Sequence, residues 1–294
     1  MLSNLVEQLL NALTLAGLLF LVSAGLSLVF GILRVVNFAH GVFYMLGAYA
    51  GWLTVHLTGS FWLALLTAPL AVGVVGVLVE RGVLQRIYGT KNANFAGVLV
   101  TYGLAIMIPD LVRMTFGRPG KPFAVPAALT GSLFRLGEID VHAYRVFILG
   151  VTAVLLPLLW LLLNRTNLGL VIRAGTSDNL MVQLLGINVA RTWTITYALG
   201  AALAAFAGVI TAPLVAVAPE MGGLVLIECF IVTVVGGMGT FLGVVAGGLL
   251  IGESLAITGM LYDVFADVVI YLAMALVLLV RPRGLFGQEG MSEE

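Results

Sequence analysis

Long apolar runs separated by short polar intervals dominate this chain. A helix needs roughly 20 apolar residues to cross the hydrocarbon of a bilayer, and nine runs approach that length. They cover residues 10–31, 39–57, 61–79, 96–115, 146–163, 192–213, 223–237, 240–258 and 263–280. Several are shorter than a full span. The pattern therefore predicts an all-α, polytopic membrane bundle of about eight or nine segments, some of them broken or re-entrant.

One polar interval, residues 164–191, separates two of these runs and reads NRTNLGLVIRAGTSDNLMVQLLGINVAR. A membrane-spanning chain does not need such a segment to stay in lipid. Gly169, Gly175 and Gly186 divide it into short pieces, which is typical of one or two short helices. We expect these helices to lie outside the hydrocarbon and to be presented to a partner.

The basic residues indicate which side faces the cytoplasm. Alternating spans place residues 80–95, 164–191 and the C-terminal Arg281–Gly287 on one side, with residues 117–145 on the other. The first side holds Arg81, Arg86, Lys91, Arg165, Arg173, Arg191, Arg281 and Arg283, with Arg34 expected to join them, against Arg113, Arg118, Lys121, Arg135 and Arg145. The excess predicts a cytoplasmic segment 164–191 and an external loop 117–145.

Composition agrees with a single membrane domain over residues 1–294. Hydrophobic residues make up 61% of the chain and charged residues 10%, with a mean hydropathy of +1.13, far from soluble domains. The net charge of +0 argues against a nucleic-acid partner. The first ten residues lack the basic start of a cleavable signal peptide, so we expect an uncleaved first helix.

Glycine and polar residues mark two candidate breaks in the spans. The stretch Gly31–Gly41, GILRVVNFAHG, brings Asn37 and His40 between two apolar runs, and Val234–Gly248 is interrupted at Gly236 and Gly237. Interrupted segments in both halves are typical of broken helices around a transport pathway. A polar hairpin outside the membrane is the alternative for the first stretch. A tight turn between two full spans is the alternative for the second.

Two carboxylates fall inside apolar runs. A charged carboxylate at the bilayer centre costs roughly 2.5–3.5 kcal/mol, so Glu228 is expected to face protein or water. Glu253 lies closer to the predicted outer end, where it can reach the interface. Both are candidates for the translocation pathway, against the alternative of a structural or neutral carboxyl group.

No catalytic or nucleotide motif emerges from the sequence. His40, His56 and His142 lie in different segments without metal-ligand spacing. The stretch Gly117–Pro122, GRPGKP, lacks the spacer and the Ser or Thr of a phosphate-binding loop. An intramembrane enzyme is not supported because no nucleophile–base arrangement is present. Any ATP-driven motor is therefore expected on another polypeptide.

The stretch RAGTSDNLMVQLLGINVAR, residues 173–191, closely resembles the cytoplasmic coupling segment of branched-chain amino-acid ABC transporter permeases. Gly25–Gly51 and Val234–Glu253 resemble the signatures of the two halves of that family, and RPRGLFG at Arg281–Gly287 is similar to its C-terminal motif. The resemblance covers both halves in order. The chain length resembles the shorter of the two paired membrane subunits.

The resemblance implies an ABC importer permease with two loosely related halves in a bacterial inner membrane. It implies a homologous permease partner, two ATP-binding subunits that hydrolyse ATP, a periplasmic or lipid-anchored binding protein, and no cofactor bound by this chain. Its substrates would be leucine, isoleucine or valine, although related permeases also carry other amino acids, amides or urea-type solutes.

The coupling residues implied by this match are Arg173, Asp178, Gly186, Ile187 and Asn188, with Asp178–Gly186 as the helix that docks in the ATPase groove. Where many relatives have alanine and charged residues, this chain has Leu180–Gln183, so we expect a more apolar contact.

A second interpretation stays open at this point. The chain could be an ion-coupled secondary transporter or channel in which Glu228 or Glu253 relays protons. Residues 164–191 would then be an ordinary loop. Uptake driven by ATP and uptake driven by a proton gradient would separate the two interpretations.

Overall fold

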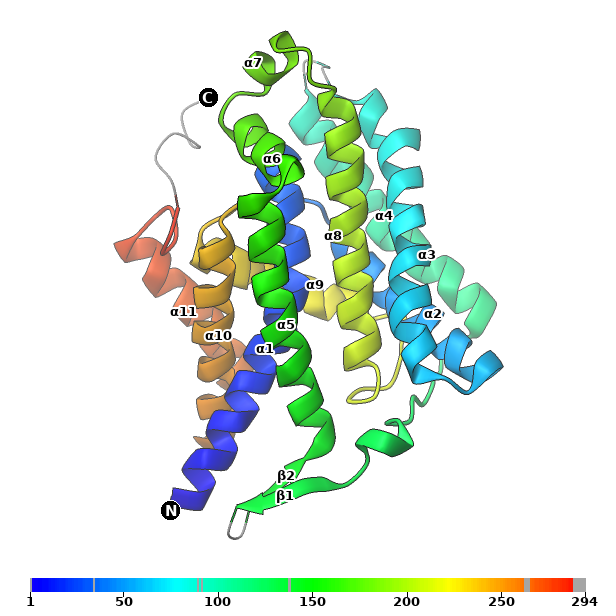
Figure 1. Cartoon of the computed structure of the whole chain (residues 1–294), viewed down its shortest axis with the longest axis vertical. Helices are drawn as coiled ribbons and strands as arrows, with labels where there is room; N and C mark the ends of the chain where they lie inside the picture. The colour runs from blue at the N-terminus through cyan, green and yellow to red at the C-terminus, as the bar shows by residue number, and fades with distance from the viewer. Residues whose placement is uncertain are drawn as a thin grey trace.

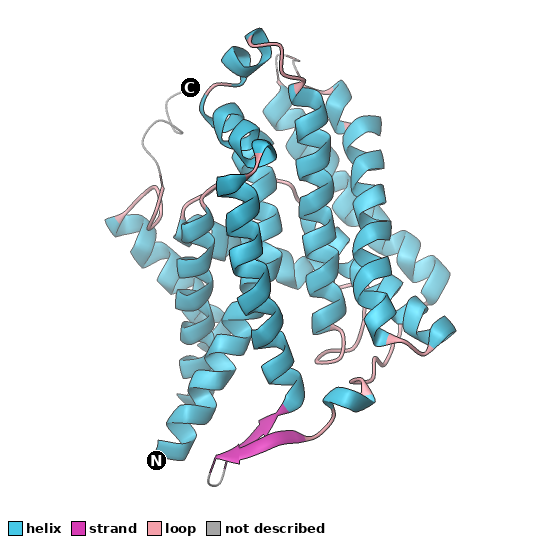
Figure 2. Cartoon of the chain, viewed as in Figure 1, coloured by secondary structure: helices cyan, strands magenta, loops and turns pink. Residues whose placement is uncertain are grey.

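The computed structural model describes residues 2–33, 35–88, 90, 92–136, 139–261 and 265–287. Within this part the chain forms eleven α-helices, two short 3-10 helices and one antiparallel pair of strands (Figure 2). The helices are α1 Leu2–Leu33, α2 His40–Thr58, α3 Phe61–Gly82, α4 Ala93–Phe116, α5 Ala143–Arg165, α6 Asn167–Ser177, α7 Asn179–Leu184, α8 Val189–Thr211, α9 Met221–Gly236, α10 Phe241–Leu261 and α11 Ala266–Val280; the 3-10 helices are Leu84–Arg86 and Ala127–Leu129. The predicted all-α membrane bundle is confirmed.

Each of the nine predicted apolar runs coincides with one helix. Six helices are long and apolar enough to cross a membrane, and they correspond to α1, α3, α4, α5, α8 and α10. The apolar helices α9 and α11 have 16 and 15 residues, fewer than the roughly 20 that a perpendicular span requires. The expectation of incomplete segments therefore holds for these two helices.

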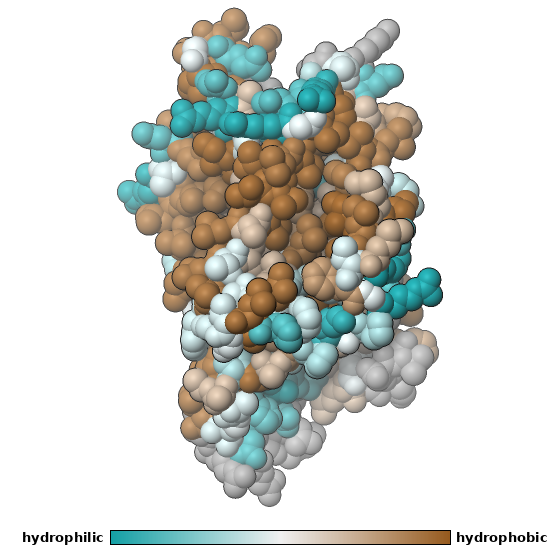
Figure 3. Space-filling model, turned by 90° about the vertical axis from the view of Figure 1, so that its right-hand side faces the viewer, coloured by the Kyte–Doolittle hydropathy of each residue, from teal (hydrophilic) through white to brown (hydrophobic). Residues whose placement is uncertain are grey.

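Helices α1, α2 and α8 form the interior of the bundle. The membrane-length window of α1 is 83% buried and that of α8 is 61% buried, whereas those of α4 and α5 are 17% and 11% buried. The outward faces of the outer helices are apolar. Figure 3 shows a broad hydrophobic band on one side of the molecule, bordered by hydrophilic residues toward both ends. Such a band is typical of a surface that faces lipid or another membrane subunit.

Small residues allow the interior helices to approach closely. A Cβ added to Gly25 of α1 would lie 2.6 Å from the carbonyl oxygen of Gly200 of α8. Further along α8, Gly208 approaches the backbone of α2 at Tyr44. Helices in lipid gain association energy from this close packing because no hydrophobic effect acts between them.

The connections gather at the two ends of the bundle. Helices α6 and α7 and the junction between α3 and α4 lie at one end of the bundle. The start of α1 and the strands β1 Ser132–Leu136 and β2 Ile139–His142 lie at the other end (Figure 1). The strands pair antiparallel, with Arg135 opposite Asp140. This separation matches the alternation expected from the sequence. The cytoplasmic or external identity of each end stays a prediction.

Candidate functional site

The segment between α5 and α8 is held in shape by helix caps and one left-handed glycine. The Asp178 carboxylate accepts a hydrogen bond from the Met181 N–H at 2.9 Å and begins α7. Gly186 has φ +79° after the helix, a conformation that favours glycine. The Asn188 side chain then accepts from the Arg191 N–H at 3.0 Å and begins α8. Three of the predicted coupling residues thus define this turn.

Around that turn, apolar side chains are exposed at the end of the bundle. We call Leu180, Met181, Leu184, Leu185 and Ile187 the α7 patch. Leu180 is 68% exposed, and Leu184 and Leu185 are each 72% exposed. Arg173 is also exposed, on the preceding helix α6. A group of exposed apolar residues beyond the lipid-facing band marks an interaction surface.

Helix α6 connects this exposed turn to the interior of the bundle. Ile172 of α6 is buried and packs with Leu28 of α1. Trp193 of α8 packs against the same pair. The packing joins the α7 end to two interior helices.

The stretch between α1 and α2 returns into the bundle. Asn37 is 2% exposed and His40 is fully buried. His40 Nε2 lies 2.9 Å from the carbonyl oxygen of Val22, which precedes the end of α1 at Leu33 by eleven residues, or roughly 16 Å at 1.5 Å per residue. The described part of this stretch is therefore a re-entrant loop and not an exposed hairpin. Arg34 lies outside the described residues.

Asn37 is only partly hydrogen-bonded. Its Oδ1 accepts from the Ala39 N–H at 3.1 Å and from the Tyr197 hydroxyl at 3.3 Å. Its Nδ2 is buried and has no hydrogen-bond partner within the described chain. The backbone N–H of Ala39 can only donate, so the contact fixes which side-chain atom is the oxygen. This buried amide donor is therefore left unpaired among the described residues.

Glu80 is a buried carboxylate that the sequence analysis missed. Its side chain is fully buried in the last turn of α3. Oε2 accepts a hydrogen bond from the Thr194 hydroxyl of α8 at 2.7 Å, and Oε1 has no partner among the described residues. Glu80 borders Arg81 at the end of an apolar run, so it was assigned to the polar interval 80–95. The extension of α3 to Gly82 places it inside the bundle.

A cavity of about 130 Å³ lies beside Asn37 and Tyr197. It is enclosed by the re-entrant loop, the junction between α3 and α4, and the helices α4 and α8. Its lining residues are Leu33, Val35, Asn37, Leu84, Ile87, Tyr88, Ala93, Asn94, Gly97, Thr101, Trp193 and Tyr197. Of the residues predicted for the translocation pathway, the structure places Asn37 at this cavity.

The glycine-rich stretch after α9 forms a tight turn. Gly237 and Gly239 have φ +109° and +76°, and α10 begins at Phe241. The C-terminal segment caps α9 here, because the N–H groups of Leu285 and Phe286 donate to the carbonyls of Val235 and Gly236 at 2.9 Å. The turn alternative is thus the one observed, between a short α9 and a long α10. Gly236 and Gly237 shape this turn.

Glu228 and Glu253, the two carboxylates predicted for the translocation pathway, are not among the residues that line the cavity at Asn37. Glu228 is half-buried in α9 and lies close enough to Tyr44 of α2 to interact electrostatically with it. The starts of α9 and α2 approach each other through Gly222 and Gly41. Glu253 is exposed on α10. The structure therefore places Glu228 near the start of α2 and Glu253 on an outer face.

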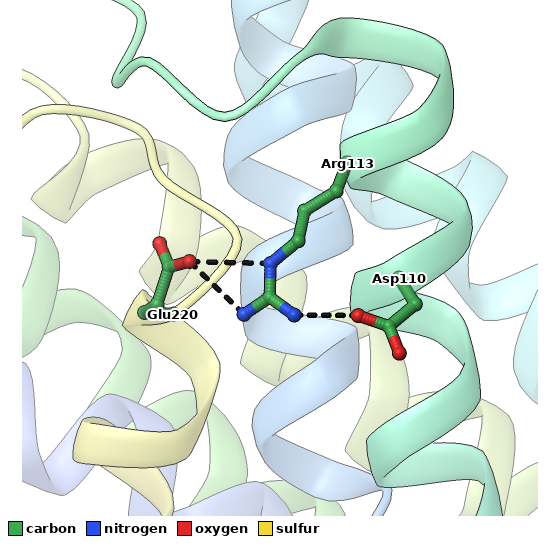
Figure 4. A network of polar contacts seen from close by, with 3 residues as sticks. All are labelled: Asp110, Arg113 and Glu220. Carbon is green, nitrogen blue, oxygen red and sulfur yellow. Dashed lines mark hydrogen bonds and ion pairs between the residues drawn. The ribbon is translucent and has the colours of Figure 1, made fainter.

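An ion-pair network joins the last turn of α4 to Glu220, the residue that precedes α9 (Figure 4). Arg113 of α4 donates through Nε and Nη2 to Glu220 Oε1 at 3.2 and 3.0 Å, and through Nη1 to Asp110 Oδ1 at 2.5 Å. Nearby, Lys121 and Val217 exchange backbone hydrogen bonds of 2.8 and 3.0 Å. These contacts join the loop after α4 to the segment before α9.

Within the described residues, no three His, Cys, Asp or Glu side chains gather in a group that could hold a metal ion. The buried polar groups of the described interior are amides, hydroxyls, the His40 imidazole and single carboxylates. They can form hydrogen bonds to a small solute. The functional features are therefore an exposed docking surface at one end and a polar cavity in the interior.

Known proteins resemble this chain over both of its halves. A family described as branched-chain amino acid transport system, permease component, matches residues 8–279. The high-affinity branched-chain amino acid transport system permease protein BraD of Pseudomonas aeruginosa is 31% identical, with 96% of this chain and 95% of the relative covered. LivH of Escherichia coli, with the same description, is 28% identical over the same shares.

A more distant relative is the probable branched-chain amino acid transport permease protein LivH of Methanocaldococcus jannaschii, at 27% identity over 94% of this chain and 91% of the relative. No solved structure matches the chain. The nearly complete family match, together with six membrane-length helices, establishes that the chain belongs to the permease components of branched-chain amino acid transport systems.

Proposed function

We propose that this chain is the membrane-spanning subunit of an ATP-driven importer for branched-chain amino acids in a bacterial inner membrane. The relatives are named as permease proteins of high-affinity branched-chain amino acid transport systems. A homologous permease would pair with it, two ATP-binding subunits would power it, and a periplasmic or lipid-anchored binding protein would deliver the substrate. The chain itself would hydrolyse no ATP and hold no cofactor.

The observation that carries this proposal is the α7 patch. Its side chains are exposed at an end of the bundle, and the caps at Asp178 and Asn188 hold the turn rigid. A short apolar helix of this kind fits a groove on a partner subunit. We assign that groove to the ATP-binding subunits, with the segment 164–191 on the cytoplasmic side and residues 117–145 outside.

The packing behind the patch supports a mechanical role. A displacement of α7 would move α6, which packs through Ile172 on Leu28 of α1 and on Trp193 of α8. Closure of the ATP-binding subunits would thereby shift the interior helices as rigid bodies. Arg173 and Ile187, both exposed beside α7, would contribute to the same contact surface.

The re-entrant loop supports a pathway through the interior. Asn37 lies buried in the connection between α1 and α2, His40 lies buried at the start of α2, and Glu228 lies near Tyr44 one turn into α2. Irregular backbone at depth is tolerated where protein or a water-filled space surrounds it. The substrate would pass along this interior face, with the Gly236–Gly237 turn and Glu253 contributing at its margin.

Reconstitution tests the proposal. Proteoliposomes that contain this chain, its permease partner, the ATP-binding subunits and the binding protein should accumulate labelled leucine only when ATP is present on the side of the ATP-binding subunits. Omission of any one component should abolish uptake. Uptake by this chain alone under a proton gradient would contradict the proposal and would favour the ion-coupled interpretation.

A further inference from the structure

The cavity at the re-entrant loop combines buried polar donors with apolar walls. Asn37 closes it on the interior side at 2% exposure, whereas Asn94 lies at an exposed position on α4. The cavity therefore extends from the surface near the α3–α4 junction toward the interior. Its aliphatic wall is formed by Leu33, Leu84 and Ile87.

Its aromatic wall is fixed by packing. The rings of Tyr88 and Trp193 meet edge to face, with centroids 4.7 Å apart, and Tyr197 packs in the same way on Phe43 at 5.7 Å. Edge-to-face pairs stabilise the orientation of each ring. These ring contacts fix the orientation of the aromatic wall.

Two polar atoms at the cavity have unused hydrogen-bonding capacity. Asn37 Nδ2 and the Tyr88 hydroxyl are both buried without a partner in the described chain. The Thr101 hydroxyl donates to Gly97 O at 2.9 Å and retains its acceptor capacity. The cavity can therefore donate to a carboxylate through Asn37 and Tyr88, and accept from an ammonium group through Thr101 and the Asn94 amide oxygen.

The size and lining restrict the ligand further. None of the described residues that line the cavity is charged, and the volume is about 130 Å³. An apolar cavity of about 150 Å³ binds benzene, so this one accommodates a branched aliphatic side chain. A ligand with a charged or long polar side chain would lose hydration without a compensating partner.

We infer that this cavity is a binding subsite for an aliphatic amino acid within the permease itself. The aliphatic side chain occupies the space between Leu84, Ile87 and Trp193, and the α-carboxylate accepts hydrogen bonds from Asn37 and Tyr88. This inference rests on the proposed function and adds a selective site to it. Because Trp193 also packs on α6 through Ile172, the ligand contacts a residue that the α7 end can move.

Direct binding to the purified permease complex in nanodiscs tests the inference. Tritiated leucine is the probe, and the binding protein is left out so that it cannot supply the affinity. The wild-type complex should bind leucine saturably, and unlabelled valine should compete. Absence of saturable binding would overturn the inference, because the unpaired donors would then be satisfied by water.

Asn37→Asp separates a ligand contact from a structural role. The substituted side chain keeps an oxygen for Ala39 and Tyr197 but replaces the amide donor with an anionic acceptor that repels a carboxylate. Leucine affinity should fall by about tenfold or more. Asn92→Asp is the matched control, because Asn92 is exposed just before α4 and is not among the cavity residues. Equal affinities for the two variants would overturn the inference.

Ala93→Leu tests the side-chain space. The larger residue fills part of the cavity and should reduce leucine binding relative to valine by about tenfold, the effect of one methylene group in an apolar pocket. Ala96→Leu is the control, since Ala96 is similarly half-buried on α4 but does not line the cavity. An unchanged leucine-to-valine ratio would contradict the inference.

If Ala93→Leu does not assemble, Leu84→Ala provides the opposite change. It enlarges the cavity and should raise the preference for leucine over valine, and an unchanged preference would again count against the subsite. Uptake in the full reconstituted system separates the subsite from the proposed function. ATP-driven uptake without any of these binding effects would refute the subsite alone, whereas absence of ATP-driven uptake by the wild type would refute the proposed function.

Discussion

Truncation of two leucines in the α7 patch should weaken the attachment of the ATP-binding subunits. Leu180 and Leu184 are 68% and 72% exposed in the isolated chain, so most of their surface remains to be buried by a partner. Full burial of a leucine side chain contributes about 1.5–3 kcal/mol. The exposed fractions therefore correspond to about 1–2 kcal/mol each, or about 2–4 kcal/mol for the pair.

The double variant Leu180→Ala/Leu184→Ala should raise the dissociation constant by about 30-fold to 1,000-fold, since each 1.4 kcal/mol is about a factor of ten. The measurement is equilibrium binding of purified ATP-binding subunits to the permease pair in nanodiscs. Leu214→Ala is the control, because Leu214 is 47% exposed in the segment before α9. An unchanged dissociation constant for the double variant would refute the assignment of the α7 patch.

Three further predictions concern single positions. Gly186→Pro should abolish ATP-dependent uptake without loss of membrane insertion. Gly186 has φ +79° and its N–H donates to the Gln183 carbonyl, and proline permits neither. Gly186→Asn should retain uptake, and full activity of the proline variant would contradict the assignment of Gly186 to the coupling turn. Thr194→Val should lower the free energy of unfolding of the complex by about 1–3 kcal/mol, because it leaves the buried Glu80 carboxylate without its hydroxyl donor. The same substitution should cost less in a Glu80→Gln variant, and an equal cost in both backgrounds would argue against the contact. Arg113→Gln should leave the unfolding temperature unchanged, because exposed ion pairs contribute little to stability. A clear drop in that temperature would show that the ion pairs of Arg113 stabilise the fold.

The sequence predicted the membrane class and the helices well because both depend on local pattern. Nine apolar runs became nine helices. Asp178 and Asn188 were identified through the family resemblance, and the helix caps that they form act within three positions of the chain. The β1–β2 hairpin was not predicted, since its short strands carry no long alternating pattern inside the polar loop 117–145.

The interior site was harder to predict because it is built from residues far apart in the chain. Asn37 was identified from the break in the apolar pattern, but its contact with Tyr197 and its place at the cavity depend on tertiary packing. Glu80 gave no signal, since a carboxylate beside an arginine at a helix end is ordinary in sequence. Its burial follows from the packing of α3 on α8, which places Thr194 beside it.

Site-specific crosslinking from α7 tests the central claim most directly. A photoreactive residue at position 184, which is 72% exposed in the chain, would be activated in the assembled complex, with position 214 as the control at the opposite end. We expect an adduct between position 184 and the ATP-binding subunit, and none with that subunit from position 214. Failure of position 184 to crosslink to the ATP-binding subunit, or an adduct with the binding protein instead, would contradict the assignment of the α7 patch to the ATP-binding subunit.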